Sequence, residues 1–170
     1  METKIRYEID ALDYIAKVAD GHMRDALTLL DKCLAYSKEL TLENVTKALG
    51  TVDYDIMFKL TDKLISNKLK DCIDIIEDIH ASGKEIKQFI LQYTKFILDI
   101  TKYCTGCGWE YLSIPKLPDY EAWISACGSP EFEICYDILD MCVRLNNTLK
   151  FSQSPKADVE AEMLLTFRSE

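Results

Sequence analysis

The spacing of apolar residues along this 170-residue chain is the feature that most limits its fold. In nearly every segment, apolar residues recur three and four positions apart, which is the period of a helix rather than that of a strand. One face of the stretch 86–100 shows the pattern most clearly, with Ile86, Phe89, Ile90, Tyr93, Ile97 and Ile100. The sequence therefore predicts an all-α protein.

Glycine and proline fall mostly between the predicted helices, where they end or begin them. The predicted helices span residues 11–19, 22–36, 41–49, 53–67, 69–81, 84–103, 120–126, 131–149 and 156–167. The stretch 104–119 contains Gly106, Gly108, Pro115 and Pro118, and it reads as a loop. Because this loop also carries Trp109, Tyr111, Leu112 and Ile114, we expect it to pack against the protein rather than to act as a flexible linker.

The short break at residues 50–53 divides the chain into two predicted domains. Residues 1–50 form a small three-helix domain, in which Leu27, Leu30 and Leu34 share one helix face, and residues 53–170 form a helical bundle. Thr41 and Asp53 are suited to cap the helices that follow them, and Gly50 to end the helix before it. Apolar residues left exposed on the helices 84–103 and 131–149 would indicate an oligomer contact.

The charge and composition exclude several classes of protein. The formal net charge is −9, which argues against binding of nucleic acid by bulk electrostatics in this segment. No apolar run approaches the roughly 20 residues needed to cross a membrane, and the charged N-terminus METKIRYEID carries no secretory signal. We therefore expect a cytoplasmic protein whose seven cysteines, an odd number, are free thiols in a reducing compartment.

Cys104 and Cys107 form a CxxC pair, the one arrangement of residues that suggests metal or redox chemistry. A structural zinc site needs four ligands, and the chain has no second CxxC or HxxxH pair. A thioredoxin-like role needs a βαβ context, which the helical pattern does not provide. The sequence thus favours two ordinary thiols, with no metal site and no catalytic residue, and leaves a small metal or redox protein as the least favoured interpretation.

Arg24 is the main candidate for a functional residue. It falls in the first turn of a predicted helix that follows the turn at Gly21, where a cation opposes the helix macrodipole at a cost of about 0.3–1 kcal/mol. A cation in this position raises the question of which anion it serves. From the residues alone, an ion pair with Asp20 or Asp25 is the simpler answer, since surface ion pairs are common and weak.

Three stretches of the sequence resemble a known family. The segment GHMRDALTLLD, residues 21–31, closely resembles the sensor 2 helix of the bacterial clamp-loader ATPase, the gamma/tau subunit of DNA polymerase III, whose pattern is Gly-Ser-x-Arg-Asp-Ala-x-Ser-x-x-Asp. His22 stands where that family has a small residue. LENVTKALGTVD at 42–53 and SPKADVEAEMLLTF at 154–167 resemble the next lid helix and the last collar helix, in the same order.

The resemblance implies that residues 1–50 are the lid of an AAA+ ATPase and residues 53–170 the collar, with the ATPase core absent. The chain has no GxxxxGK[ST] or GxGxxG sequence that could cradle phosphates. As this segment, it is then not an enzyme and holds no cofactor, whereas the parent protein would bind ATP and Mg²⁺. In the family, the sensor 2 arginine contacts the phosphates of ATP bound in the core of its own subunit, and by motif this residue is Arg24.

The resemblance also implies partners. The family's collar assembles clamp-loader subunits into a five-membered ring, and its ATPase modules place a sliding clamp on primed DNA. We therefore expect a role in DNA replication, with other clamp-loader subunits bound through the collar, the clamp and primed DNA bound through the absent ATPase domain, and homo-oligomers as a further option. The alternative is a helical adaptor, unrelated to ATPases, that binds partner helices in a groove between its long helices.

Overall fold

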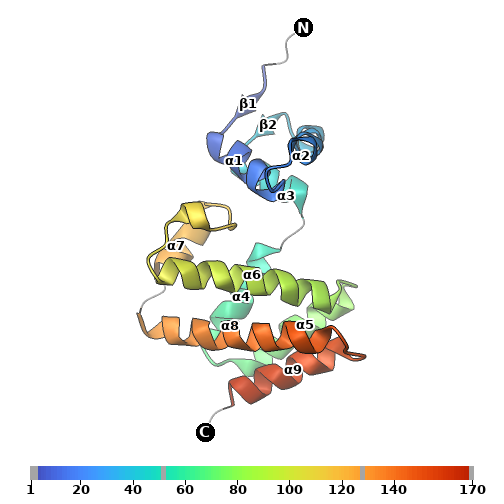
Figure 1. Ribbon diagram of the computed structural model, residues 1–170, viewed down its shortest axis with the longest axis vertical. Coiled ribbons are helices and arrows are strands. Elements are labelled where there is room, and N and C mark those ends of the chain that lie inside the picture. Colours follow the sequence, from blue (N-terminus) through green and yellow to red (C-terminus); the bar gives the residue numbers. More distant parts are fainter. Residues whose placement is uncertain (1–3, 51–52, 127–128, 169–170) are drawn as a thin grey trace. The chain divides into compact units, whose positions relative to one another are not determined.

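The computed structural model describes residues 4–50, 53–126 and 129–168, and this part of the chain is mostly helical. Its helices are α1 (Ile9–Val18), α2 (Met23–Tyr36), α3 (Leu42–Leu49), α4 (Tyr54–Ile65), α5 (Leu69–Ala81), α6 (Ile86–Cys104), α7 (Pro118–Ala126), α8 (Ser129–Leu149) and α9 (Pro155–Thr166), and a 3-10 turn spans Trp109–Tyr111. Figure 1 shows this order along the chain. The predicted all-α class is confirmed.

A very small sheet, which the sequence analysis did not predict, joins the start of the chain to α3. Strand β1 (Arg6–Tyr7) runs parallel to β2 (Glu39–Leu40), with Arg6 opposite Glu39 and Tyr7 opposite Leu40. The N–H of Glu8 donates to the oxygen of Leu40 at 3.0 Å, and a carboxylate oxygen of Glu8 accepts from the N–H of Leu42 at 2.8 Å. The strand pair therefore fixes the entry into α1 and satisfies a free amide at the start of α3.

The chain separates into two compact units, and each is described by itself. Unit 1 comprises residues 1–52 and 111–126, and unit 2 comprises 53–110 and 127–170. Within unit 1, the Lys17 ammonium donates to the oxygen of Leu112 at 3.2 Å, and Leu117 packs against the core formed by α1, α2 and α3. The contact-defined units thus add residues 111–126 to the first three helices, whereas the domain limits 1–50 and 53–170 stay a prediction.

The core of unit 1 lies between α1, α2 and α3. Its buried residues are Ala11, Tyr14, Ile15, Cys33, Leu40, Leu42, Val45 and Leu49. Helix α2 contributes only Cys33 as a buried residue, while Leu30 and Leu34 are half-buried and Leu27 is 53% exposed. The predicted shared face of Leu27, Leu30 and Leu34 is therefore wrong for Leu27, because α2 packs through a face rotated toward Ala26, Leu29 and Cys33.

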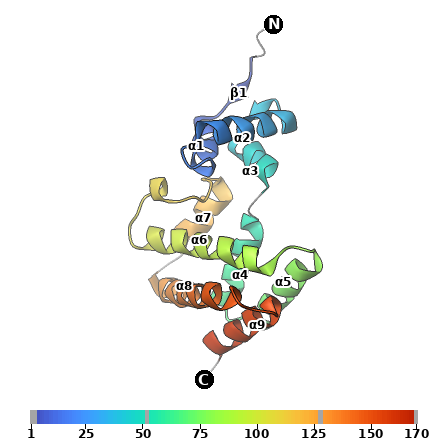
Figure 2. The ribbon, with the colours of Figure 1, turned by 45° about the vertical axis from the view of Figure 1, so that its right-hand side comes forward.

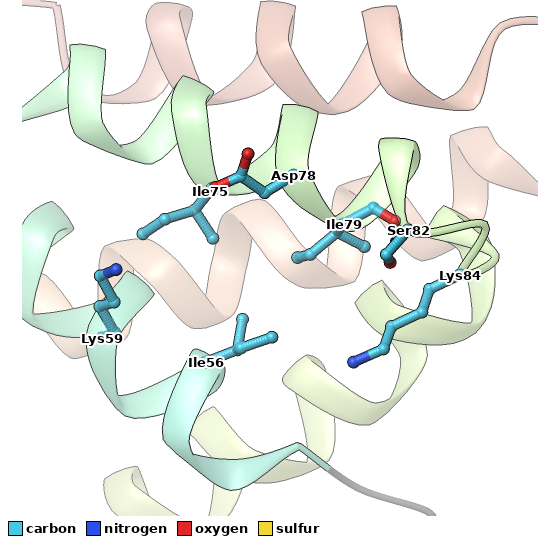
Figure 3. Close-up of a pocket in the computed structure, with 7 residues that line it drawn as sticks. All are labelled: Ile56, Lys59, Ile75, Asp78, Ile79, Ser82 and Lys84. Atoms are coloured by element: carbon cyan, nitrogen blue, oxygen red, sulfur yellow. Dashed lines mark hydrogen bonds between the residues drawn. The ribbon is translucent and has the colours of Figure 1, made fainter.

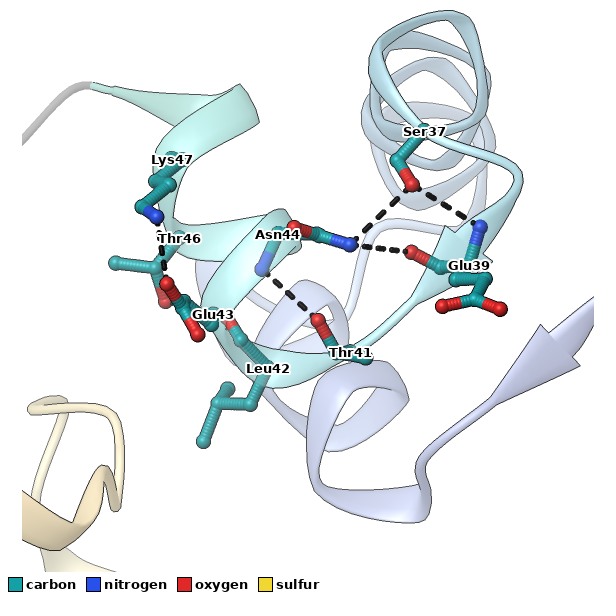
Figure 4. A network of polar contacts seen from close by, with 8 residues as sticks. All are labelled: Ser37, Glu39, Thr41, Leu42, Glu43, Asn44, Thr46 and Lys47. Carbon is teal, nitrogen blue, oxygen red and sulfur yellow. Dashed lines mark hydrogen bonds and ion pairs between the residues drawn. The ribbon is translucent and has the colours of Figure 1, made fainter.

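Three of the predicted helix ends are confirmed in detail. The hydroxyl of Thr41 accepts from the N–H of Asn44 at 3.1 Å, and a carboxylate oxygen of Asp53 accepts from the N–H of Ile56 at 3.3 Å. Gly50 ends α3 with φ of +51°, the left-handed conformation that glycine adopts without steric cost. Figure 4 shows how Asn44 also donates to the Ser37 hydroxyl at 3.2 Å and to the Glu39 oxygen at 3.1 Å, so the same side chain fastens β2 to α3.

Unit 2 is built on the antiparallel pair α6 and α8, which run side by side in Figures 1 and 2. Helix α9 packs on α8, and α4 and α5 complete the bundle. Its fully buried residues include Met57, Leu60, Leu64, Ile76, Ile90, Tyr93, Ile97, Ile100, Ile138 and Met141. The Tyr93 hydroxyl lies 2.8 Å from the hydroxyl of Thr61, and burial, with the nearby Cys142 thiol, raises the pKa of Tyr93 well above its ordinary value.

No helix in the described part of the chain is long and apolar enough to span a membrane.

Candidate functional site

The turn between α1 and α2 holds the start of α2 in an exposed position. Asp20 and Gly21 adopt positive φ values of 50° and 76°, and the N–H of His22 donates to the oxygen of Ala19 at 3.0 Å. Glycine favours this region, and aspartate is among the residues that tolerate it best. The Nδ1 of His22 donates to the oxygen of Asp20 at 3.0 Å. His22, which departs from the family pattern, therefore braces the turn from which α2 begins.

The first turn of α2 has no side-chain cap. His22 occupies the capping position without such a bond, and the first backbone bond of the helix joins the N–H of Ala26 to the oxygen of His22 at 2.9 Å. In the described part of the chain, the N–H groups of Met23, Arg24 and Asp25 have no acceptor within the protein, and all three residues are exposed. Such free amides at a helix N-terminus are suited to bind an anion.

The guanidinium of Arg24 is available at the same helix end. Among the residues that the structure describes, it forms no hydrogen bond or ion pair, and the expected alternative partners Asp20 and Asp25 do not engage it. Only its backbone oxygen is engaged, by the hydroxyl of Thr28 at 3.0 Å. Arg24 therefore offers a planar set of donors that nothing in unit 1 uses, next to free backbone amides on an otherwise acidic chain.

Apolar side chains flank this arginine. Met23 is 73% exposed and Leu27, one helical turn later, is 53% exposed. Exposure of these apolar side chains to water is unfavourable. Because they lie next to Arg24, the start of α2 is an amphipathic surface with a positive charge at its centre. The arrangement can bind an anion and an apolar surface together, and it contains no nucleophile paired with a base.

Cys104 and Cys107 lie at the end of α6 and just beyond it. Both are half-buried, and the hydroxyl of Thr105 lies 3.8 Å from the Cys107 sulfur. Over residues 4–50, 53–126 and 129–168, no group of three or more His, Cys, Asp and Glu side chains could hold a metal ion.

The thiols provide a test of the fold. Burial raises the pKa of Cys142 to about 12 and that of Cys72 to about 11, so at neutral pH their thiolate populations are at least about 100-fold below ordinary values. We expect iodoacetamide to alkylate Cys104 and Cys107 rapidly while sparing Cys72 and Cys142, as measured by peptide mass spectrometry. In urea these four thiols should react at similar rates; equal rates in the native protein would contradict the fold of unit 2.

A pocket of about 150 Å³ opens between α4 and α5 in unit 2. Figure 3 shows Ile56, Ile75 and Ile79 around its centre, with Lys59 and Lys84 on opposite sides and Asp78 and Ser82 at the rim. Lys84 pairs with Asp53 at 2.9 Å, which leaves Lys59 and Asp78 with opposite charges. The sequence analysis did not single out these residues, because isoleucines at helical spacing are typical of core. The balanced charge does not favour a phosphate or a metal.

Comparisons with known proteins show which proteins this chain resembles. Residues 1–39, which include Arg24, match the family described as the ATPase lid domain of the DNA polymerase III clamp loader subunit. The chain is 24% identical over 162 residues to DNA polymerase III subunit tau of Bacillus subtilis, covering 95% of this chain and 29% of the relative. It is 28% identical over 167 residues to subunit gamma of Buchnera aphidicola from Acyrthosiphon pisum, covering 94% and 45%.

A solved structure shares the fold along almost the whole chain. It is the DNA clamp loader delta protein of Bacillus subtilis, with a TM-score of 0.52, 14% sequence identity, and coverage of 99% of this chain and 53% of that one. At this identity the likeness shows the fold alone. It extends the agreement beyond residues 1–39, because it includes the helices of unit 2.

The fold and these matches define a class: the chain is related to the clamp-loader subunits of DNA polymerase III. Within this class, its sequence is similar to the gamma and tau subunits, as the resemblance of residues 21–31 predicts. The chain spans less than half the length of these two relatives. The role of Arg24 stays a prediction.

Proposed function

We propose that this chain is the lid and collar segment of a replicative clamp-loader subunit, which assembles the loader and couples the nucleotide state to the loading of a sliding clamp on primed DNA. The observation that carries the proposal is the unpartnered guanidinium of Arg24 beside the free amides that begin α2, inside the stretch that matches the clamp-loader lid. The helical adaptor is not favoured, because it gives no reason for this arrangement.

In this proposal Arg24 senses ATP held by an ATPase core of the same subunit. The bound nucleotide with its Mg²⁺ supplies the phosphate charge, and the residues available to meet it are Arg24 and the N–H groups of Met23 and Asp25. A guanidinium binds phosphate oxygens through several donors at once, so it favours the lid position that brings Arg24 to the phosphates. Met23 and Leu27 would then pack against the core that carries the nucleotide.

Unit 2 would serve as the collar that binds other clamp-loader subunits, with the clamp and DNA bound through the ATPase core. This chain alone would not hydrolyse ATP, since its only proposed contact with the nucleotide is a sensing residue. The role in replication would place the protein in the cytoplasm.

Arg24→Ala in the longer protein that carries the ATPase core tests the proposal. A charge-assisted hydrogen bond contributes about 1.5–3 kcal/mol, so we expect ATP-dependent clamp loading to fall about 10- to 150-fold, while assembly of the loader is unchanged. Clamp loading on primed DNA and sedimentation of the assembled loader give the two readouts.

Arg6→Ala is the matched control, because Arg6, in strand β1, is the other arginine of unit 1. Its side chain forms an exposed ion pair with Glu39 at 3.6 Å. This control should load clamps normally. If Arg24→Ala disrupts assembly while nucleotide-dependent loading per assembled complex is normal, Arg24 is a structural residue and the sensing role is wrong.

A further inference from the structure

His22 makes three hydrogen bonds that join the end of α1 to the start of α2. Its N–H donates to the oxygen of Ala19 at 3.0 Å, its oxygen accepts from the N–H of Ala26 at 2.9 Å, and its ring Nδ1 donates to the oxygen of Asp20 at 3.0 Å. Arg24 lies two residues further along the chain. The conformation of His22 therefore sets the direction in which the first turn of α2, and Arg24 with it, leaves the end of α1.

The ring bond acts on a strained residue. Asp20 has a φ of +50°, in the left-handed region that residues with a side chain rarely adopt, and such a conformation persists only where surrounding contacts hold it. The N–H of Asp20 donates to the oxygen of Lys17 at 3.1 Å, and its own oxygen accepts from the His22 ring. Without this ring, the oxygen of Asp20 would lose the donor that the described part of the chain gives it, and the turn could adopt conformations in which α2 begins in another direction.

The ring bond is not a helix cap. A capping side chain accepts a hydrogen bond from a free N–H of the first helical turn. The Nδ1 of His22 carries a proton, which it donates back to the oxygen of Asp20, and no side-chain cap is formed. The bond therefore holds the turn while it leaves available the amides beside Arg24 that a cap would occupy.

We propose that His22 is a positioning residue for nucleotide sensing, which holds the turn between α1 and α2 so that the guanidinium of Arg24 meets the phosphates in one orientation. A guanidinium binds phosphate oxygens through several donors in a fixed plane, so a small change in the direction of the helix start weakens several bonds at once. His22 needs no contact with the nucleotide for this role. The inference rests on the sensing role proposed for Arg24 and adds the residue that orients it.

His22→Ala in the longer protein that carries the ATPase core tests the inference. Loss of one hydrogen bond between neutral groups should raise the ATP concentration that half-saturates clamp loading about 2- to 12-fold, with the maximal rate unchanged. A role in folding alone would instead lower the amount of active loader, and hence the maximal rate. The assay is clamp loading on primed DNA, measured over a series of ATP concentrations.

Two further variants serve as controls. His22→Asn should restore most of the ATP dependence, because the side-chain amide of asparagine carries a donor where the ring carries Nδ1. His80→Ala changes the other histidine of the chain, which is exposed near the end of α5, and should alter neither the half-saturating ATP concentration nor the maximal rate. Circular dichroism of the 170-residue chain checks that each variant is folded.

A double variant shows whether His22 acts through Arg24. His22→Ala added to Arg24→Ala should lower clamp loading by less than about twofold more, because no guanidinium is left to orient. Fully additive effects, or a normal ATP dependence of His22→Ala while Arg24→Ala impairs loading, overturn this inference and leave the sensing role of Arg24 standing. If Arg24→Ala itself loads clamps normally, the sensing role fails, and the orienting role of His22 fails with it.

The 170-residue chain gives a second readout, which needs no nucleotide. Proton–nitrogen correlation spectra of the histidine rings in alkaline buffer, where histidine is neutral, show which ring nitrogen carries the proton. We expect His22 to carry it on Nδ1, as the bond to the oxygen of Asp20 requires. A His22 ring protonated on Nε2 would show that this bond is absent, and it overturns the inference whatever the loading assay gives.

Discussion

Tyr93→Ala is expected to lower the free energy of unfolding of unit 2 by about 3–5 kcal/mol, the usual cost of removing a large aromatic side chain from a core. Tyr93 is fully buried on α6, and its ring stacks between Phe89 and Phe96, with ring centroids 5.9 and 6.0 Å away. Alanine removes both ring contacts and the bond to the Thr61 hydroxyl, and leaves a cavity at the centre of the bundle. A loss of this size is a large part of the stability of a small domain.

Urea denaturation followed by circular dichroism measures this effect, with two controls. Tyr93→Phe keeps the ring and should cost about 1 kcal/mol, because the Thr61 hydroxyl still donates to the oxygen of Met57 at 2.8 Å. Tyr136→Ala removes a tyrosine that is 46% exposed and should cost clearly less than Tyr93→Ala. Equal effects of the two alanine variants would show that Tyr93 is not central to the core.

Leu49→Ala is expected to unfold much of unit 1 while leaving unit 2 folded. Leu49 is 3% exposed at the end of α3 and belongs to a core of only a few buried residues. Removal of a buried leucine side chain costs about 2–5 kcal/mol, which is comparable with the whole stability that so small a core provides. Hydrogen exchange measured by mass spectrometry should show loss of protection in α1, α2 and α3, with α6 and α8 unchanged.

Leu27→Ala is the matched control for this experiment. Leu27 is also a leucine of the first three helices, but more than half of its side chain is exposed. Its substitution should change protection in α1–α3 little, since surface substitutions are usually within about 0.5 kcal/mol. Loss of protection in Leu27→Ala as large as that in Leu49→Ala would contradict the packing of α2.

The helices could be predicted because each has apolar residues at helical spacing and residues that mark where it begins or ends. Thr41, Gly50 and Asp53 mark helix boundaries by local chemistry, which acts over a few residues and is visible in the sequence. The two-residue strands β1 and β2 could not be predicted, because they arise from pairing between segments more than thirty residues apart. Such short strands have no period of their own to detect.

The packing partners were harder to predict than the helices. Trp109, Tyr111, Leu112 and Ile114 were expected to pack against the protein. Leu112 and Ile114 are indeed buried, whereas Tyr111 is 63% exposed, and nothing in the sequence says that Leu112 and Ile114 belong to unit 1. Leu27 shows the same limit at the scale of one residue, because a leucine fits the helical period whether or not the neighbouring helices reach it. Tertiary contacts decide both cases.

The candidate site was accessible to sequence reasoning only in part. The position of Arg24 in a first helical turn was predicted from the glycine before it and from the resemblance of residues 21–31. Its freedom from Asp20 and Asp25 depends on side-chain directions that the sequence does not contain. The pocket between α4 and α5 was missed because its isoleucines look like any other core residues until the helices are placed together.

The assignment of residues 111–126 to unit 1 has a consequence for dissecting the protein. The polypeptide passes from one unit to the other three times, near residues 52, 110 and 126. No single proteolytic cut or stop codon can therefore release either unit whole. A chain shortened after residue 52 lacks Leu112 and Leu117, and one that starts at residue 53 carries residues 111–126 without the helices they pack on. An intact unit 1 requires a circular permutant that joins residues 111–126 directly to residues 1–52, and an intact unit 2 requires a loop in place of residues 111–126.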